Sequence, residues 1–383
     1  MDRVAVVACP SYDQSQGAIS SALEFLGASA CFRGKRVLLK VNLMKGADPS
    51  LAVNTHPEFV RALVRIVQRQ GGKAIIADSS GILGLTMEAF RAAGIAAVAA
   101  DEGAELFNLD ACRPVRKVVA GHVLREIWAP GILDSADLLV TVPKLKTHTQ
   151  TLMTCAVKNQ VGILPGGSKC RIHEAAPTPE RLAHAILDIN QAVPFSLAVV
   201  DGILGLAGQG KFVPPAPTHL GAVIVGTNLV SVDAVCADLI GFRPEEVPTT
   251  RLGAERGMGE SDLEKIEVVG DDRKTLRVAF RRPGFEPKRW RFVAWPLYRT
   301  RGRSVRPVVM NEKCRQCGDC AAVCPTKAIA LVPYPRVSAD CIYCFACHER
   351  CPTGAMRLQC RRLLRGSFRK RAAGLDVSEI MGS

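Results

Sequence analysis

The chain of 383 residues lacks any apolar run approaching the about 20 residues of a membrane-spanning helix, and charges interrupt every candidate. Its N-terminus, MDRVAVVACPSYD, has neither the basic nor the apolar region of a secretory signal peptide. We therefore predict a soluble, cytoplasmic protein with no membrane span. Aromatic residues make up only 5% of the chain, but 48% of the residues are hydrophobic, which excludes wholesale disorder.

Acidic residues are scarce in the last third of the chain. After residue 270 there are 24 Lys and Arg against 9 Asp and Glu, whereas the first 270 residues hold 26 against 27. We interpret residues 271–307 as a basic linker or wrapping segment and 361–383 as a basic tail. Such a surface, at 271–310 and 361–371, predicts an acidic redox partner protein. A nucleic-acid partner is disfavoured, because no recognised motif accompanies the aromatic side chains Trp290, Phe292, Trp295 and Tyr298.

Residues 1–270 alternate short β-branched runs with helical patterns, which predicts an α/β domain with a mostly parallel sheet covered by helices. The expected strands are Val4–Cys9, Arg36–Val41, Lys73–Asp78, Asp137–Val142, Leu197–Asp201 and Ala222–Gly226. The expected helices are Ser15–Leu26, His56–Gln70, Thr86–Ala93, Pro179–Gln191 and Ser231–Ile240. Ligands of such sheets usually bind beyond the carboxyl ends of the strands, so we expect functional residues there.

Disulfides are not expected among the 15 cysteines, because their number is odd and no secretion signal precedes them. Eight of them form two C-x₂-C-x₂-C-x₃-C-P motifs, at 314–325 and 341–352, spaced as in bacterial two-cluster ferredoxins. In those proteins the fourth cysteine of each motif ligates the other cluster. This rule assigns one [4Fe-4S] cluster to Cys314, Cys317, Cys320 and Cys351, and the second to Cys341, Cys344, Cys347 and Cys324. A zinc module is the alternative. We predict a small α+β ferredoxin-like domain at 308–360.

No Asp or Glu occurs between Asp137 and Glu174, although this segment is rich in cations. A cationic cluster without local counter-ions, following a strand, predicts a site for an anionic substrate or cofactor; a solvated basic loop is the alternative. The candidate catalytic residues are His148, Lys158 and His173. The imidazoles of the two histidines suit either proton transfer or metal binding. The candidate anion-binding residues are Lys144, Lys146, Asn159, Lys169, Asp78 and Asp201.

Several of these assignments have structural alternatives. Asp78 either contacts a ligand or caps the following helix. Asp201 lies in a glycine-rich stretch that either surrounds an anion with N–H groups or forms a flexible turn. For Asp233, near the start of a helix, a structural role is sufficient. Asn42, at the end of the second expected strand, is a plausible polar contact.

Certain motifs resemble a known family. LLKVNLM (38–44), NTHPEFVRALV (54–64), ADSSG (77–81), VPKLKTH (142–148), VKNQVG (157–162), VVDGILGLAGQG (199–210) and VSVDAVCADLIG (230–241) are similar to the domain of unknown function 362 family. The resemblance covers about residues 3–245, with 308–358 for the ferredoxin module that members often carry, and it implies no established reaction. Where the family commonly has Glu and then Gly-Pro after Asp201, this chain has Ala207 and Gly210-Lys211, which removes an acid and adds a cation.

A second resemblance concerns the order of His148, Lys158 and His173. It is similar to the cofactor-binding domain of nickel-pincer lactate racemases, which implies that a lysine and histidines hold a pyridinium nucleotide and its metal.

The leading functional hypothesis is an iron–sulfur oxidoreductase, in which two [4Fe-4S] clusters relay electrons to or from an anion bound in the α/β domain. The alternative is a non-catalytic electron-transfer protein whose large domain docks a redox partner.

Overall fold

The structure, a computed structural model, describes residues 1–81, 84–208, 214–283 and 305–360. The predictions for Gly210 and Lys211, for the arginine- and aromatic-rich stretch 284–304 and for the tail 361–383 therefore concern residues outside the described part. Within the described part, no helix is both long and apolar enough to cross a bilayer.

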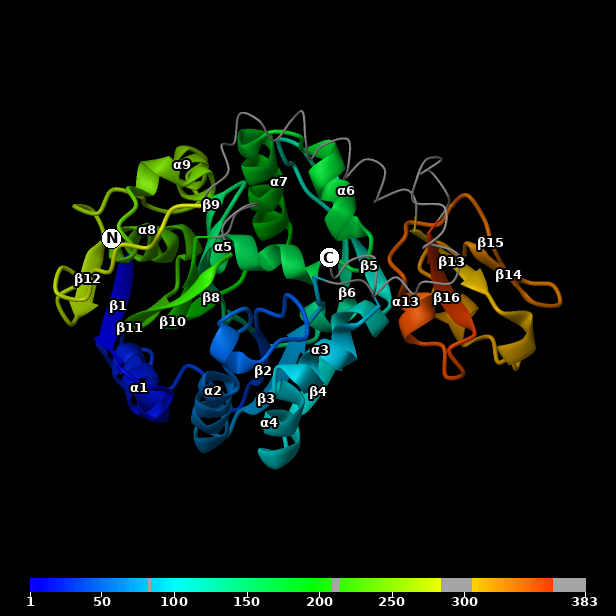
Figure 1. The fold of residues 1–383 in the computed structure, drawn as a ribbon, viewed down its shortest axis with the longest axis horizontal. Coiled ribbons are helices and arrows are strands. Elements are labelled where there is room, and N and C mark those ends of the chain that lie inside the picture. The colour runs from blue at the N-terminus through cyan, green and yellow to red at the C-terminus, as the bar shows by residue number, and fades with distance from the viewer. Residues whose placement is uncertain (82–83, 209–213, 284–304, 361–383) are drawn as a thin grey trace.

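A ten-stranded mixed sheet forms the centre of the large domain (Figure 1). Its main path is β12-β1-β11-β10-β7-β2-β3-β4, and β8 pairs with β10 and with β9. The strands are β1 Arg3–Ala8, β2 Arg36–Lys40, β3 Lys73–Asp78, β4 Glu105–Asn108, β7 Leu138–Thr141, β8 Lys144–His148, β9 Leu152–Thr154, β10 Leu197–Ala207, β11 Ala216–Gly226 and β12 Glu267–Gly270. Among the described strands of this sheet, only the pairs β1–β11, β10–β11 and β8–β9 are antiparallel, so the predicted mostly parallel α/β fold is confirmed.

Helices cover both faces of this sheet. Alternate side chains of each strand point to opposite faces, and both sets are apolar, so each face needs a layer of helices to bury it. On β2, Leu38 belongs to one core, whereas Val37 and Leu39 belong to the other. The second core packs under α1 Ser15–Phe25, α2 Pro57–Arg69, α3 Thr86–Ala92 and α4 Ile95–Asp101. The first packs under α5 Ala156–Asn159, α6 Ser168–Ala175, α7 Pro179–Ala192, α8 Leu229–Leu239 and α9 Pro248–Glu255.

The structure contains more strand than the sequence predicted in two places. The strand predicted at Leu197–Asp201 continues to Ala207, past an irregularity between Gly202 and Leu204, because it pairs along its length with β11, which begins at Ala216. Asp201 therefore lies inside β10 instead of at its carboxyl end. The segment Lys144–His148, placed by the sequence after the strand Asp137–Val142, is itself the strand β8, which excludes the alternative of a solvated basic loop there.

A smaller module lies at one end of the molecule (Figure 1). It pairs β13 Val305–Val309 with β16 Met356–Cys360, and β14 Ile329–Leu331 with β15 Pro335–Val337, and it contains the short helices α12 Asp319–Ala322 and α13 Ala346–Glu349. Helix α13 packs against the turn Leu109–Ala111 of the large domain, next to the hairpin of β5 Pro114–Val118 and β6 Glu126–Pro130. The Asn108 Nδ2 atom donates a hydrogen bond to Glu349 Oε2 at 2.9 Å across this contact.

Candidate functional site

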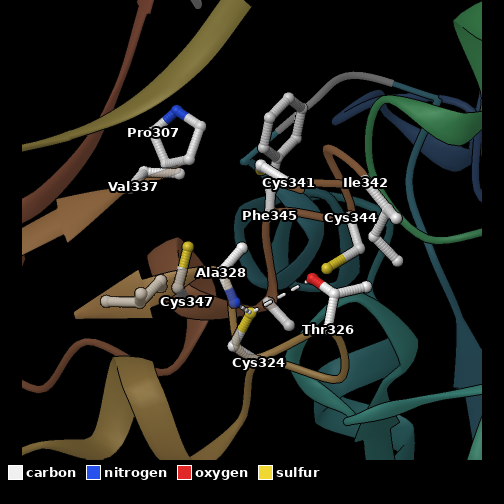
Figure 2. A pocket seen from close by; sticks show the side chains of 12 residues that line it. Pro307, Cys324, Thr326, Ala328, Val337, Cys341, Ile342, Cys344, Phe345 and Cys347 are labelled. Carbon is white, nitrogen blue, oxygen red and sulfur yellow. Dashed lines mark hydrogen bonds between the residues drawn. The ribbon is translucent and has the colours of Figure 1, made fainter. Parts of the chain in front are cut away.

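The eight motif cysteines line two cavities of the small module. Cys324, Cys341, Cys344 and Cys347 line the first, which we call site B (Figure 2). The second, site A, is lined by Cys314, Cys317, Cys320 and Cys351. The structure thus brings the cysteines together in the two groups that the crossed assignment expects, while iron ligation itself remains a prediction.

The surroundings of both sites suit clusters with thiolate ligands. Backbone N–H groups point at the sulfurs: Ala328 N donates to Cys324 Sγ at 3.2 Å, and Met356 N donates to Cys351 Sγ at 3.4 Å. Burial raises the pKa of the Cys344 thiol to about 12, so iron must displace its proton. Among the described residues, no three His, Cys, Asp or Glu side chains form a group suited to a single metal ion. The thiolates of a four-iron cluster lie further apart than the ligands of a single ion, because each one binds a different iron of the cubane.

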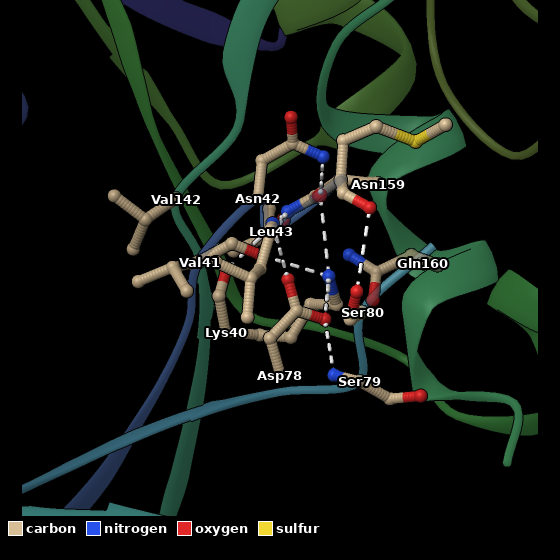
Figure 3. Close-up of polar contacts among 12 residues, drawn as sticks. Lys40, Val41, Asn42, Leu43, Asp78, Ser79, Ser80, Val142, Asn159 and Gln160 are labelled. Carbon is tan, nitrogen blue, oxygen red and sulfur yellow. Dashed lines mark hydrogen bonds and ion pairs between the residues drawn. The ribbon is translucent and has the colours of Figure 1, made fainter. Parts of the chain in front are cut away.

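In the large domain, a fully buried ion pair joins the ends of β2 and β3 (Figure 3). Lys40 Nζ lies 2.8 Å from Asp78 Oδ1, and both side chains are 1% exposed. Asp78 Oδ2 also accepts the N–H of Leu43 at 2.7 Å. Asp78, proposed from the sequence as a ligand contact or a helix cap, is therefore engaged by a lysine and by backbone N–H groups of its own domain.

Asn159 joins this pair to the neighbouring strands. Its Oδ1 accepts from Lys40 Nζ at 3.2 Å and from Asn42 Nδ2 at 3.0 Å, and its Nδ2 donates to Thr141 Oγ1 at 2.9 Å. Both the oxygen and the nitrogen of the Asn159 amide are therefore hydrogen-bonded, and these bonds orient the end of α5 against the sheet. Figure 3 shows the amide directed at the Lys40–Asp78 pair.

A second buried ion pair joins β8 and β10. Lys144 Nζ lies 2.6 Å from Asp201 Oδ2, and neither side chain is exposed. Tyr12 Oη donates to Asp201 Oδ1 at 3.1 Å and accepts from Lys144 Nζ at 2.9 Å, and burial raises its pKa strongly. The Tyr12 ring stacks on His56 with the centroids 3.6 Å apart. The prediction that the lysines of this segment lack counter-ions was wrong for Lys144, because Asp201 lies 57 residues further along the chain but directly opposite on the sheet.

The remaining lysines have only neutral acceptors among the described residues. Lys146 Nζ donates to Asn42 Oδ1 at 2.7 Å and to Val53 O at 3.0 Å. Lys169 Nζ donates to Ser79 O at 2.7 Å, to Ser80 O at 2.6 Å and to the Ser79 hydroxyl, which uses all three of its N–H groups. Lys158 has no hydrogen-bond or ion-pair partner in the described part of the chain.

Lys146, His148, Lys158 and His173 lie close enough to perturb one another. Burial, and then the charge of Lys158, lowers the pKa of Lys146 to about 7. Burial lowers the pKa of Lys158 to about 8. Burial lowers the pKa of His148 well below its usual range, with further contributions from Lys158, His173 and Lys146. The same two causes, burial and Lys158, lower the pKa of His173 to about 3. We call these four residues the lysine–histidine site.

Both histidines are therefore neutral at pH 7. His148 Nδ1 accepts the N–H of Gln150 at 3.1 Å, which leaves the ring proton on Nε2.

Asp233 positions the short helix α5 that carries Lys158 and Asn159. From α8, its carboxylate accepts the N–H groups of Ala156 at 2.7 Å and Val157 at 3.3 Å, at the start of α5. Burial raises its pKa to about 7. This is a structural role, as the sequence suggested.

The turn Gly166–Gly167 precedes α6, the helix that carries His173, and contacts the loop of site B. Gly167 N donates to Tyr343 O at 2.9 Å, and Gly166 N donates to Asp110 Oδ1 at 2.9 Å. Asp110 Oδ1 also accepts from the Ser79 hydroxyl at 2.5 Å, next to Lys169. The sequence analysis missed Tyr12, His56 and Asp110, because none of them lies in a motif whose residue spacing indicates ligand binding or catalysis.

Three comparisons place the chain among known proteins. A family model described as "Domain of unknown function (DUF362)" matches residues 37–238, more than half of the chain, and a "4Fe-4S dicluster domain" model matches 306–352. The chain is 29% identical over 273 residues to a thylakoid-associated protein of Synechocystis, covering 68% of this chain and 81% of that protein.

Two further similarities concern the small module alone. An uncharacterized polyferredoxin-like protein of Methanocaldococcus jannaschii is 37% identical over 59 residues, which is 12% of this chain and 35% of that protein. A polyferredoxin of Methanothermobacter marburgensis is 40% identical over 58 residues, covering 14% of this chain and 13% of its own length.

Among solved structures, the lactate racemase apoprotein of Thermoanaerobacterium thermosaccharolyticum aligns with a TM-score of 0.37 and 12% identity, over 57% of this chain and 54% of its own. A Thermotoga maritima protein aligns with a TM-score of 0.38 and 13% identity, over 59% and 58%. The chain thus spans little more than half of either structure.

Proposed function

Because the chain belongs to the domain of unknown function 362 family and carries a 4Fe-4S dicluster domain, we propose that it is an iron–sulfur oxidoreductase. Its two [4Fe-4S] clusters relay electrons to or from an anionic substrate or cofactor at the lysine–histidine site. We further propose the domain division 1–270, 271–307, 308–360 and 361–383, and an acidic protein as the external redox partner.

The observation that carries this proposal is the charge of the site. Lys146 and Lys158 lie near each other without a carboxylate partner in the described part of the chain, whereas Lys40 and Lys144 each have one. Uncompensated, desolvated lysines repel each other, and an anion relieves that cost. The helix that carries His173 begins next to the loop of site B, where Gly167 N donates to Tyr343 O.

In this mechanism Lys146 and Lys158 bind the anion. Lys169 adds positive charge while its ammonium group holds the Ser79–Ser80 backbone in place, whereas the charge of Lys144 is balanced by Asp201, which it positions. The neutral imidazole of His148 donates from Nε2, and His173 is a second group for proton transfer. The clusters, when bound, supply one-electron chemistry that the side chains cannot.

Anion binding should weaken as the pH rises from 6 to 9. Below pH 7 both lysines are charged; Lys146 loses its proton around pH 7 and Lys158 around pH 8. Because the bound anion favours the charged forms, its binding shifts this loss to higher pH. Sulfate, whose charge is constant over this range, is the probe, and calorimetry on the oxidised holoprotein should show about a tenfold or larger loss of affinity. Constant affinity across the range would contradict these roles.

Replacing Lys158 by methionine keeps an unbranched side chain, one atom shorter, and removes its charge. We expect sulfate affinity at pH 6.5 to fall about tenfold or more, with the iron content unchanged because all eight cysteines remain. The matched control is Lys73→Met, which removes an exposed lysine at the amino end of β3. Equal sulfate affinity in all three proteins would reject the anion site and favour the alternative, a non-catalytic electron-transfer protein whose large domain docks a partner.

A further inference from the structure

Helix α6, Ser168–Ala175, has different neighbours on its two sides. Lys169 and His173 are four residues apart, so they share the face towards the lysine–histidine site. Arg171, between them in sequence, projects from the opposite face. Its guanidinium lies 5.1 Å from the centroid of the Tyr343 ring, and Tyr343 stands between the site B ligands Cys341 and Cys344.

The start of α6 also touches site B through its backbone. Gly166 has φ +47°, and a Cβ atom there would lie 2.5 Å from the carbonyl oxygen of Cys344. Only glycine permits this approach. With the Gly167–Tyr343 hydrogen bond, it fixes α6 against the loop that holds two ligands of site B.

Site A faces outward. Arg315, Gln316 and Cys317 in its first loop are exposed, as are Pro352 and Thr353 in its second. Among the described residues, the two sites therefore differ in their surroundings: the large domain contacts the loop of site B, whereas the loops of site A are exposed.

We propose that α6 couples the cluster of site B, and not that of site A, to the lysine–histidine site, so that anion binding and reduction at site B oppose each other. This inference rests on the proposed function. One-electron reduction, by a partner protein in the cell or by dithionite in the experiment, adds one negative charge at site B. An anion bound by Lys158 repels that charge, and by linkage the reduced protein binds the anion more weakly. Arg171 favours the added charge.

The test is a redox titration of the holoprotein, followed by electron paramagnetic resonance, with and without saturating sulfate. We expect sulfate to lower the midpoint potential of site B and to leave that of site A unchanged. A tenfold weaker sulfate affinity of the reduced protein corresponds to a shift of about 59 mV. Cys341→Ser and Cys314→Ser identify which signal belongs to which site, because each alters one ligand set.

Two arginine variants test the contact without any ligand. Arg171→Gln should lower the midpoint potential of site B alone, and Arg315→Gln, beside site A, should lower that of site A alone. An Arg171→Gln protein with unchanged site B potential and intact iron content would overturn the inference.

The outcomes also separate this inference from the proposed function. If calorimetry shows sulfate binding but the potential of site A shifts, or neither shifts, the coupling through α6 is wrong and the anion site stands. If sulfate does not bind, the proposed function is rejected, and a shift of site B in Arg171→Gln would still support the contact but not the coupling to an anion.

Discussion

The Cys324→Ser protein is expected to lose the cluster of site B while retaining that of site A. The intact protein should contain about eight iron and eight sulfide ions per chain, because each [4Fe-4S] cluster takes four thiolates. Cys324 belongs to the first motif but lines the cavity of Cys341, Cys344 and Cys347. Iron analysis of anaerobically purified protein should therefore fall to about four, with the remaining signal that of Cys314, Cys317, Cys320 and Cys351.

The control for this experiment is Cys112→Ser, which replaces a partly exposed cysteine outside both motifs. It should leave the iron content unchanged. Loss of the site A signal in Cys324→Ser would contradict the crossed ligation, and one or two zinc ions in place of iron would contradict the clusters altogether.

Breaking the Lys144–Asp201 pair should destabilise the large domain strongly. Both side chains have no exposed surface, and removing one partner leaves the other as a buried, uncompensated charge. Such changes cost about 3–5 kcal/mol in the free energy of unfolding. We therefore expect Lys144→Met to lower the urea midpoint of the holoprotein clearly, and Lys144→Met combined with Asp201→Leu to recover part of the loss.

An exposed ion pair is the matched control. Arg3 and Glu267 are 3.0 Å apart, with side chains 43% and 45% exposed, and Arg3→Gln should change the free energy of unfolding by about 1 kcal/mol or less. If Lys144→Met proved no more destabilising than Arg3→Gln, the buried pair would not have the structural importance we assign to it.

The elements that the sequence predicted well depend on local pattern. Helix α2 was predicted as His56–Gln70 and observed as Pro57–Arg69, because its apolar residues recur at helical spacing. The motif spacing of the cysteines is likewise local, and it identifies the two-cluster pattern, whose known crossed ligation predicted how the cysteines group.

The parts that were not predictable depend on strand order. Nothing in the segment around Lys144 indicates that Asp201 lies opposite it, because that contact exists only once β8 and β10 are neighbours. The same holds for Asp110, which follows the edge strand β4 and reaches Gly166 N only through the packed structure. A count of charges along one segment therefore overestimated the free positive charge of the site.

Asp110 also affects the path of the proposed electron transfer between the small module and the large domain. Its carboxylate binds Ser79, Thr86 and Gly166, and the adjacent Asn108 binds Glu349 of the small module. A redox domain on a flexible linker transfers electrons by moving between its donor and its acceptor. In the proposed relay, these contacts hold the cluster module against the large domain, so an electron passing between the two crosses a fixed distance. The rate of transfer then depends on that distance and on the driving force, and not on the diffusion of a mobile arm.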